Sequence, residues 1–274
     1  MFQAGVAAFQ AGRLDEARAA FFHAGQAGKI HASALYCYLT ASRFDWDEGV
    51  TLLRQLAPHR VDNARQLALI DAMTGAPLPP GEVLSEAPHL TRFRAFFTPA
   101  ECVYLAEAAR PMLRRSTIIL RGREHADPAR TSDSAAFPLA IENPAVHALN
   151  RRIAAASGTD VRQGEPLQIL RYRQGGEYQP HFDAIPGLAN QRILTMIVWL
   201  NDGYEGGETH FPKAALKLKG GVGDALLFRN TLADGKRDLA TLHAGLPVIA
   251  GEKRLASRWI RATSFQPEYD GNPR

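Results

Sequence analysis

The stretch PLQILRYRQGGEYQPHFD, residues 166–183, decides the fold of the C-terminal part of the chain. It reads as a strand, a Gly-Gly turn and a second extended segment. Further short segments rich in β-branched and aromatic residues follow, separated by Gly, Asn and Asp turns: RILTMIVWLND, GETHFP, ALKLKG, DALLFRN and RLASRWIRATSF. No helices alternate with these segments to build a parallel sheet, so the pattern predicts an all-β sandwich, jelly roll or barrel.

Two His-x-Asp pairs could supply metal ligands. A divalent iron site commonly uses two imidazoles and one carboxylate on one face of an octahedron. In an extended segment, residues i and i+2 point the same way, so strand context separates the two pairs. His125 and Asp127 lie in the charged stretch LRGREHADPARTSD with Pro128 directly after them, which predicts a solvated loop. His181 and Asp183 follow a strand and a turn, and they are the predicted metal pair.

The third ligand has two candidates downstream, His210 in GETHFP and His243 in LATLHAGLPVIAGEKRLASRWIRA. His243 is followed by Lys253, across a turn at Gly251 that could return the chain as a neighbouring antiparallel strand. A lysine beside an iron site can bind the far carboxylate of a dicarboxylate, a use for a buried cation that is otherwise costly. His210 has no such companion, so we expect it on the surface or the barrel wall.

The N-terminal residues 1–74 predict helices joined by short turns. Small and apolar residues recur at helical spacing in FQAGVAAFQAGRLDEARAAFFHAGQAG, and Gly12 separates two runs as a helix stop. A second pair of helices follows, with Asp47 as the expected N-cap. The pattern resembles a tetratricopeptide hairpin. Since repeat arrays need about three units to be stable alone, we expect this head to pack on the rest of the chain or on a second subunit, as a helical cap or as a peptide-binding groove.

A Pro- and Gly-rich segment separates this head from the rest of the chain. GAPLPPGEVLSEAPHL, residues 75–90, carries four prolines and two glycines with little periodicity, which is typical of a linker. We therefore expect a tetratricopeptide-like helical region over residues 1–74 and a second domain over residues 91–274.

The charge distribution is asymmetric. Residues 1–88 hold 7 Lys and Arg against 9 Asp and Glu, whereas residues 89–274 hold 25 against 19. The basic C-terminal part suits a small anionic ligand or an acidic partner. No arginine-aromatic repeat or nucleic-acid reader motif accompanies this charge, so we expect no nucleic-acid partner.

Membrane and disulfide signals are also lacking in the sequence. No apolar run approaches the roughly 20 residues of a membrane span, and the first residues lack the basic and apolar regions of a signal peptide. We therefore expect a cytoplasmic protein without a membrane partner. Cys37 and Cys102 are far apart and lack zinc-knuckle spacing, so we expect buried thiols.

Several motifs in one order connect this chain to a known family. The set RYRQGGEYQPHFD, RILTMIVWLND, YEGGETHFP, KGGVGDALLF and HAGLPVIAGEKRLASRWIR resembles the prolyl 4-hydroxylase-like branch of the Fe(II)/2-oxoglutarate dioxygenases, from about residue 90 to 266. The resemblance implies an α+β fold: a double-stranded β-helix, or jelly roll, with flanking helices, preceded by the small all-α helical-hairpin region. It implies iron held by His181, Asp183 and His243, with Lys253 on the C5 carboxylate of 2-oxoglutarate. Dioxygen is the implied co-substrate, and ascorbate is a further expected cofactor.

The resemblance also assigns further positions by their match to the family motifs. Near the co-substrate it places Tyr172, which could otherwise be a core aromatic residue, and Thr195, which could otherwise be a strand former on the wall. Trp199 stands where the family usually has tyrosine. The substrate contacts that the resemblance implies are Arg130, Ser132, Arg192, Trp259 and Tyr178. For Arg130 a surface charge is the alternative, and for Trp259 a core position.

The implied reaction is hydroxylation of a C–H bond, most simply C4 of a peptidyl proline, with release of succinate and carbon dioxide. A proline-containing peptide or protein is then the partner, and residues 121–137 and 184–191 would form loops that close on it. One alternative keeps the iron chemistry but acts on a free amino acid or other small molecule. Another is a helical-repeat interaction protein whose oxygenase domain is inactive or senses oxygen or 2-oxoglutarate. A homodimer through the helical head is a further expectation.

Overall fold

The computed structural model describes residues 1–120 and 123–265, and the chain divides into two compact units. We call the first the helical unit, which comprises Met1–Pro77 and Phe137–Arg151, and the remainder of the chain the β unit. Each unit has a hydrophobic interior of its own, so each is described by itself.

The segment predicted as a linker, residues 75–90, is more ordered than expected. It contains β1 (Gly81–Glu86) and the first residues of β2 (His89–Phe93), which pair as an antiparallel hairpin. Its prolines precede β1 or lie in the turn between the strands, so they do not interrupt the ladder of hydrogen bonds. The linker prediction was therefore wrong for residues 81–90, which belong to a sheet of the β unit.

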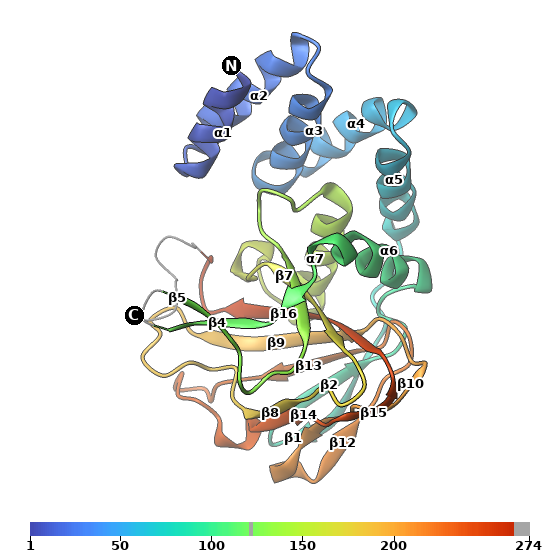
Figure 1. Cartoon of the computed structure of the whole chain (residues 1–274), viewed down its shortest axis with the longest axis vertical. Helices are drawn as coiled ribbons and strands as arrows, with labels where there is room; N and C mark the ends of the chain where they lie inside the picture. The colour runs from blue at the N-terminus through green and yellow to red at the C-terminus, as the bar shows by residue number, and fades with distance from the viewer. Residues whose placement is uncertain (121–122, 266–274) are drawn as a thin grey trace. The chain divides into compact units, whose positions relative to one another are not determined.

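The helical unit consists of helices that each pack on the next along the chain (Figure 1). Gly12 has φ of +71° and ends the first helix, as predicted. Asp45, not the predicted Asp47, caps the fourth helix, because its backbone is extended and its side chain accepts a 2.9 Å hydrogen bond from Glu48 N. The helices and the π-helix η1 span α1 (Phe2–Gln10), α2 (Leu14–Gln26), α3 (Ile30–Leu39), η1 (Thr40–Phe44), α4 (Trp46–Leu56) and α5 (Val61–Met73), and α7 (Pro144–Ser157) begins in this unit.

Small residues allow the first helices to approach closely. Ala8 and Ala17 are buried against Phe21 and Leu39, and a Cβ added at Gly5 would lie 2.8 Å from the ring of Phe21. The predicted helical head is thus confirmed as helical, whereas its assignment to tetratricopeptide repeats stays a prediction.

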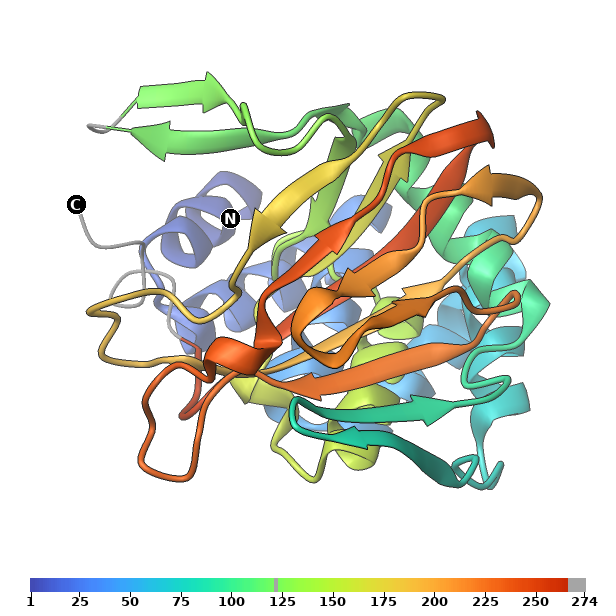
Figure 2. The same cartoon turned by 90° about the horizontal axis from the view of Figure 1, so that it is seen from below.

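The β unit is an antiparallel sandwich of two facing layers (Figure 2). The larger layer, here the major sheet, has the strand order β1-β2-β13-β9-β16-β7-β6-β3. The smaller layer, the minor sheet, has the order β12-β11-β14-β8. Two short pairs accompany them, β10-β15 and the separate β4-β5 hairpin. The strand bounds are β3 (Arg114–Arg115), β4 (Thr117–Leu120), β5 (Arg123–Ala126), β6 (Asp133–Phe137), β7 (Leu167–Tyr172), β8 (Tyr178–His181), β9 (Arg192–Trp199), β10 (Tyr204–Gly206), β11 (Thr209–Phe211), β12 (Leu216–Leu218), β13 (Ala225–Arg229), β14 (His243–Gly245), β15 (Val248–Gly251) and β16 (Lys253–Arg261).

One apolar core fills the space between the two sheets. Trp199, Leu226 and Leu255 of the major sheet share this cluster with Phe211 of the minor sheet and Val248 of β15. Burial of such side chains contributes about 1.5–3 kcal/mol each, so the facing layers stabilise one another.

Helix α6 (Pro99–Ala109) begins with a capping box, in which Thr98 accepts from Glu101 N and the Glu101 carboxylate accepts from Thr98 N.

The turn at Gly223 requires glycine. Gly223 has φ of +83°, and a Cβ there would lie 1.8 Å from the carbonyl oxygen of Phe97. Only glycine fits this turn.

Both cysteines are buried free thiols, as predicted, and burial raises the pKa of each to about 12. Within residues 1–120 and 123–265, no helix combines the length and the apolar character needed to cross a bilayer.

Candidate metal centre

The three predicted metal ligands meet at one end of the minor sheet. His181 is the last residue of β8 and His243 the first of β14, and the two strands pair these residues in register. Asp183 follows two residues after His181. The donor atoms of the three side chains lie within 4.8 Å of one another, with Asp183 Oδ1 3.7 Å from His181 Nε2 and Asp183 Oδ2 3.8 Å from His243 Nε2. This group could hold a metal ion.

Both imidazoles are oriented by backbone carbonyl groups. His181 Nδ1 lies 2.8 Å from Gln179 O, and His243 Nδ1 lies 2.9 Å from Thr241 O. Because a carbonyl oxygen only accepts, each Nδ1 carries the proton and each Nε2 presents its lone pair to the metal position. Burial, together with the neighbouring His243, lowers the pKa of His181 to about 4. The His181 imidazole is therefore neutral near pH 7, the form that coordinates a metal.

The carboxylate is held by a chain of two further side chains. Thr195 Oγ1 donates a 2.7 Å hydrogen bond to Asp183 Oδ2, and Asn230 Nδ2 donates a 2.9 Å bond to Thr195 Oγ1. Burial alone would raise the pKa of Asp183, but His243, His181 and the Thr195 hydroxyl outweigh it, and that pKa is lowered. Asp183 is therefore ionised, as a metal ligand must be.

Lys253 reaches the same cavity from the opposite layer. The expectation that His243 and Lys253 lie on neighbouring antiparallel strands is wrong, because the chain changes layers between them. After β14 of the minor sheet it forms β15, turns at Gly251 and enters the major sheet as β16, where Lys253 pairs with Tyr172 of β7. The two side chains thus line the same cavity from different layers.

The Lys253 ammonium is a buried cation. Its Nζ donates a 2.6 Å hydrogen bond to Gly207 O and lies 5.4 Å from the centre of the Tyr172 ring. Within the part of the chain that the structure describes, no carboxylate forms an ion pair with it. Burial lowers the pKa of Lys253 to about 7, partly opposed by Glu208. An anionic ligand in the cavity would restore the favourable environment that this charge lacks.

A single cavity joins the metal ligands, Lys253 and most other predicted site residues. Its wall includes the predicted residues His181, Asp183, His243, Lys253, Tyr172, Thr195, Arg130, Tyr178 and Trp259. Ser132 and Arg192 do not line it. Ser132 is buried, shares a 2.8 Å hydrogen bond with Ser116 and lies near Tyr172, so it supports the cavity from behind. Burial raises the pKa of Tyr172 to about 12.

Arg130 and Tyr178 form one side of the cavity. The Arg130 guanidinium carbon lies 5.2 Å from the centre of the Tyr178 ring, and this ring stacks on His181 at 3.5 Å between centroids. Arg130 is 8% exposed, so the alternative of a surface charge is wrong. Its Nε lies 3.5 Å from Asp127 Oδ2.

The second His-x-Asp pair is split. His125 is exposed on β5, whereas Asp127 is buried and accepts a 2.9 Å hydrogen bond from Ala129 N. His125 lies in a strand of the β4-β5 hairpin, so the predicted loop was wrong there, although the pair does not converge on a metal position. His210 is half-buried on β11, in agreement with a place on the barrel wall.

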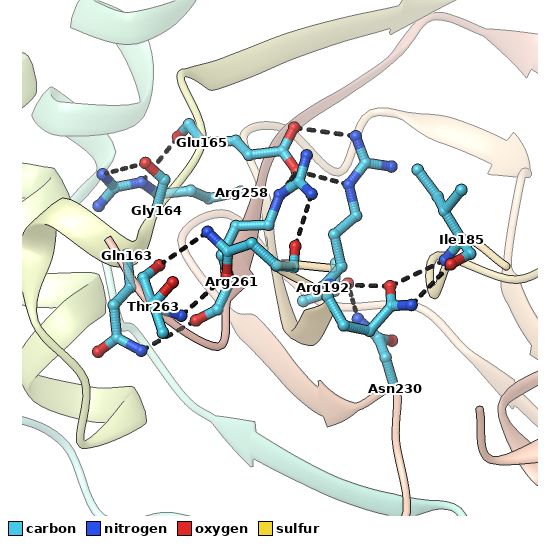
Figure 3. A network of polar contacts seen from close by, with 12 residues as sticks. Gln163, Gly164, Glu165, Ile185, Arg192, Asn230, Arg258, Arg261 and Thr263 are labelled. Carbon is cyan, nitrogen blue, oxygen red and sulfur yellow. Dashed lines mark hydrogen bonds and ion pairs between the residues drawn. The ribbon is translucent and has the colours of Figure 1, made fainter. Parts of the chain in front are cut away.

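The sequence interpretation missed a buried ion-pair network around Glu165 (Figure 3). Glu165 binds Arg192 through contacts of 2.5 and 2.9 Å and Arg261 through one of 2.6 Å. The Arg192 guanidinium carbon lies 3.7 Å from the centre of the Trp259 ring. These residues are far apart in the chain, so no local sequence motif predicts the network.

Comparison with known proteins agrees with this geometry. A family model described as the 2OG-Fe(II) oxygenase superfamily matches residues 167–261. Prolyl 4-hydroxylase 1 of Arabidopsis thaliana is 36% identical over 202 residues, which cover 66% of this chain and 71% of the relative. The chain belongs to the prolyl 4-hydroxylase family. Another relative, the human prolyl 4-hydroxylase subunit alpha-1, is 34% identical over 186 residues, covering 64% of this chain and 35% of that protein.

A solved structure supports the same fold for this prolyl 4-hydroxylase family member. The viral collagen prolyl hydroxylase of Paramecium bursaria Chlorella virus-1, in complex with 2-oxoglutarate, superposes with a TM-score of 0.53 at 27% identity. The match covers 66% of this chain and 99% of the viral one. The jelly roll expected from the sequence is thereby confirmed.

The donor set of the site fits the cofactors of the family. Two imidazoles and a carboxylate with free donor atoms suit Fe(II). A buried ammonium group in the same cavity suits the far carboxylate of 2-oxoglutarate. Fe(II), 2-oxoglutarate and dioxygen are therefore the cofactor and co-substrates of this site.

Proposed function

We propose that this protein hydroxylates C4 of a proline residue within a peptide or protein, converting 2-oxoglutarate and dioxygen to succinate and carbon dioxide. The observation that carries the proposal is that His181, Asp183 and His243 converge in the same cavity as the buried Lys253. The family membership supports proline as the substrate residue. The bound iron and 2-oxoglutarate supply the oxidising chemistry, and the protein supplies binding, orientation and exclusion of water.

His181, Asp183 and His243 would hold the iron. The Gln179 and Thr241 carbonyl groups fix the two imidazole rings, and the Thr195 hydroxyl fixes one oxygen of the carboxylate. Such outer contacts preset the ligand directions, so the site need not reorganise when the metal binds.

Lys253 would bind the C5 carboxylate of 2-oxoglutarate. Tyr172, packed beside the Lys253 ammonium, borders the same end of the cavity. Thr195 lines the cavity too, but its hydroxyl is bonded to Asp183 and Asn230, so we assign it to holding the metal ligand at the edge of the co-substrate position.

The substrate would enter past Arg130, Tyr178 and Trp259. Two of these residues are aromatic, and an apolar aromatic surface suits the ring of proline. Arg130 brings donors that can bind peptide carbonyl groups. Ser132 lies behind this wall and Arg192 stacks behind Trp259, so their proposed contribution to substrate binding is through the residues that they support. Ascorbate use and a homodimer through the helical unit stay predictions.

The experiment that tests the function measures succinate release with proline-containing peptides, with the mass gain of one oxygen atom located by fragmentation. We expect the gain on proline, dependent on iron and 2-oxoglutarate, and its loss in Asp183→Ala. Turnover of a free amino acid without any gain on peptidyl proline would favour the small-molecule alternative. Absence of 2-oxoglutarate turnover with every substrate would contradict the enzymatic function itself.

A further inference from the structure

Two arginines lie beside residues of the metal cavity and can each offer positive charge to a ligand at its entrance. Arg192 begins β9 and stacks on Trp259, which lines the cavity, and Arg237 lies in the segment between β13 and β14. They flank opposite ends of the segment 184–191, which directly follows Asp183.

Glu165 contacts a second arginine as well as Arg192, so Arg192 does not have this carboxylate to itself. Both Oε atoms of Glu165 bind Arg192, and Oε1 also lies 2.6 Å from Nε of Arg261, which is 2% exposed. One carboxylate therefore serves two guanidinium groups (Figure 3).

Arg192 keeps a hydrogen-bonding edge for a ligand. Its Nε and one Nη bind Glu165, and its flat face lies against Trp259. Among the residues that the structure describes, its second Nη has no partner, and the side chain remains 14% exposed. A guanidinium group held in one orientation loses little conformational freedom when it binds a carboxylate.

Arg237 provides the second cation. Its Nε donates a 3.0 Å hydrogen bond to Ala184 O, and its guanidinium carbon lies 4.7 Å from the centre of the Phe182 ring. Phe182 stands between the two metal ligands His181 and Asp183 in the sequence. Over residues 1–120 and 123–265, no carboxylate forms an ion pair with Arg237. Its charge is thus fixed next to the metal site without a counter-charge.

Glu208 lies on the Lys253 side of the cavity, and three further carboxylates near the cavity are engaged. Asp183 is a metal ligand, and Asp127 lies 3.5 Å from the buried Arg130. Asp238, one residue after Arg237, accepts a 2.8 Å hydrogen bond from Ala240 N and caps a short 3-10 helix. None of these three supplies an ion-pair partner for Arg237 or a second one for Arg192.

We propose that the cavity mouth selects peptides that carry an aspartate or glutamate side chain close to the target proline. This inference rests on the proposed function and adds a substrate preference to it. A carboxylate placed between the aromatic wall and the segment 184–191 would bind the free edge of Arg192, the guanidinium of Arg237, or both. Charge-assisted hydrogen bonds to fixed arginines are among the stronger polar contacts in proteins, and an unpaired cation also disfavours basic substrates.

The test compares pairs of proline peptides that differ only by glutamate or glutamine at one position, from three residues before the proline to three after. We expect kcat/KM to be about fivefold higher for glutamate at the best position, and the ratio to fall toward one as salt is raised. Arg237→Gln should lower this glutamate-to-glutamine ratio to about half or less. The control Arg254→Gln should keep the ratio, because Arg254 is an exposed residue of β16 that pairs with Glu252.

Equal kcat/KM for both members of every pair would overturn the inference while leaving the proposed function intact. A ratio that persists in both Arg237→Gln and Arg192→Gln would overturn it as well. Arg192→Gln also serves as the test if Arg237→Gln fails to fold, as judged by its melting temperature. Failure of the proposed function is distinguishable, because then no peptide of the series would gain oxygen on proline.

Discussion

Thr195 of the major sheet donates a 2.7 Å hydrogen bond to Asp183 Oδ2, so a neutral hydroxyl in one layer orients a metal ligand that follows a strand of the other. Asn230, bonded in turn to Thr195, extends this support to the end of β13. The carboxylate is thereby held by two residues outside the set of three converging ligands.

Loss of this support should weaken metal binding. Thr195→Val keeps the shape of the side chain but removes the hydroxyl, and we expect the affinity for Fe(II) to fall about 10-fold to 100-fold. The dependence of succinate release on iron concentration measures the change. Thr91→Val, at a half-buried site on β2, is the matched control. Equal iron dependence in both variants would contradict a role of Thr195 in holding Asp183.

The two His-x-Asp pairs give a direct comparison of metal binding. His243→Ala should abolish detectable Fe(II) binding, because two ligands cannot replace the facial set of three. His125→Ala, which changes an exposed histidine of β5, should leave iron affinity unchanged. Calorimetric titration with Fe(II) under anaerobic conditions distinguishes them. Retained binding in His243→Ala would mean that another residue completes the site.

Removal of the buried ammonium group should weaken the binding of 2-oxoglutarate but not the binding of iron. Lys253→Ala is expected to raise the Kd for 2-oxoglutarate about 10-fold to 100-fold, the size of a charge-assisted hydrogen bond. Iron affinity should change little, since Lys253 is not among the three converging metal ligands. Lys217→Ala, an exposed lysine on β12, controls for the loss of one positive charge. Equal loss of both affinities would count against the assignment of Lys253.

The same lysine should make co-substrate binding depend on pH. Burial lowers the pKa of Lys253 to about 7, so the free protein carries this charge below that pH and loses it above. A carboxylate binds the charged form, hence affinity for 2-oxoglutarate should be full below pH 7. It should fall by up to about tenfold per pH unit above pH 7. Lys253→Arg keeps its charge at these pH values and should flatten the profile. A wild-type profile that is flat from pH 6 to 9 would argue against this pKa.

Loss of the Glu165 carboxylate should lower the free energy of unfolding of the protein. Glu165→Ala leaves the buried Arg261 without its carboxylate, and removing one partner of a buried ion pair costs about 3–5 kcal/mol in the free energy of unfolding. Glu165→Gln retains an acceptor and should cost less. Urea denaturation measures both, with Glu205→Ala at an exposed position of β10 as control. A change below about 1 kcal/mol in Glu165→Ala would show that water or another group replaces the carboxylate.

The metal ligands could be predicted from the sequence because they depend on local patterns. His181 and Asp183 lie two residues apart after a strand-like run, and the ordered family motifs add His243 and Lys253. The spatial relation between His243 and Lys253 could not be predicted in the same way. Alternation and turn residues indicate where strands begin and end, but they do not indicate which layer each strand joins.

The ion-pair network around Glu165 could not be predicted from sequence patterns for a similar reason. Glu165, Arg192 and Arg261 are separated by tens of residues, and each alone resembles an ordinary surface charge. Only the sandwich brings them together, since β9 and β16 are neighbours in the major sheet and Glu165 precedes β7 on the other side of β16. The hairpin of β1 and β2 was missed because the prolines around β1 were interpreted as a sign of a linker.

The placement of the site between the layers has a mechanical consequence. His181 and His243 belong to the minor sheet, whereas Lys253 projects from the major sheet. A 2-oxoglutarate molecule bound by Lys253 at one end and by the metal at the other would link the two sheets. Conversion of this dicarboxylate to the shorter succinate would remove the link at each turnover, and binding of the next 2-oxoglutarate would restore it.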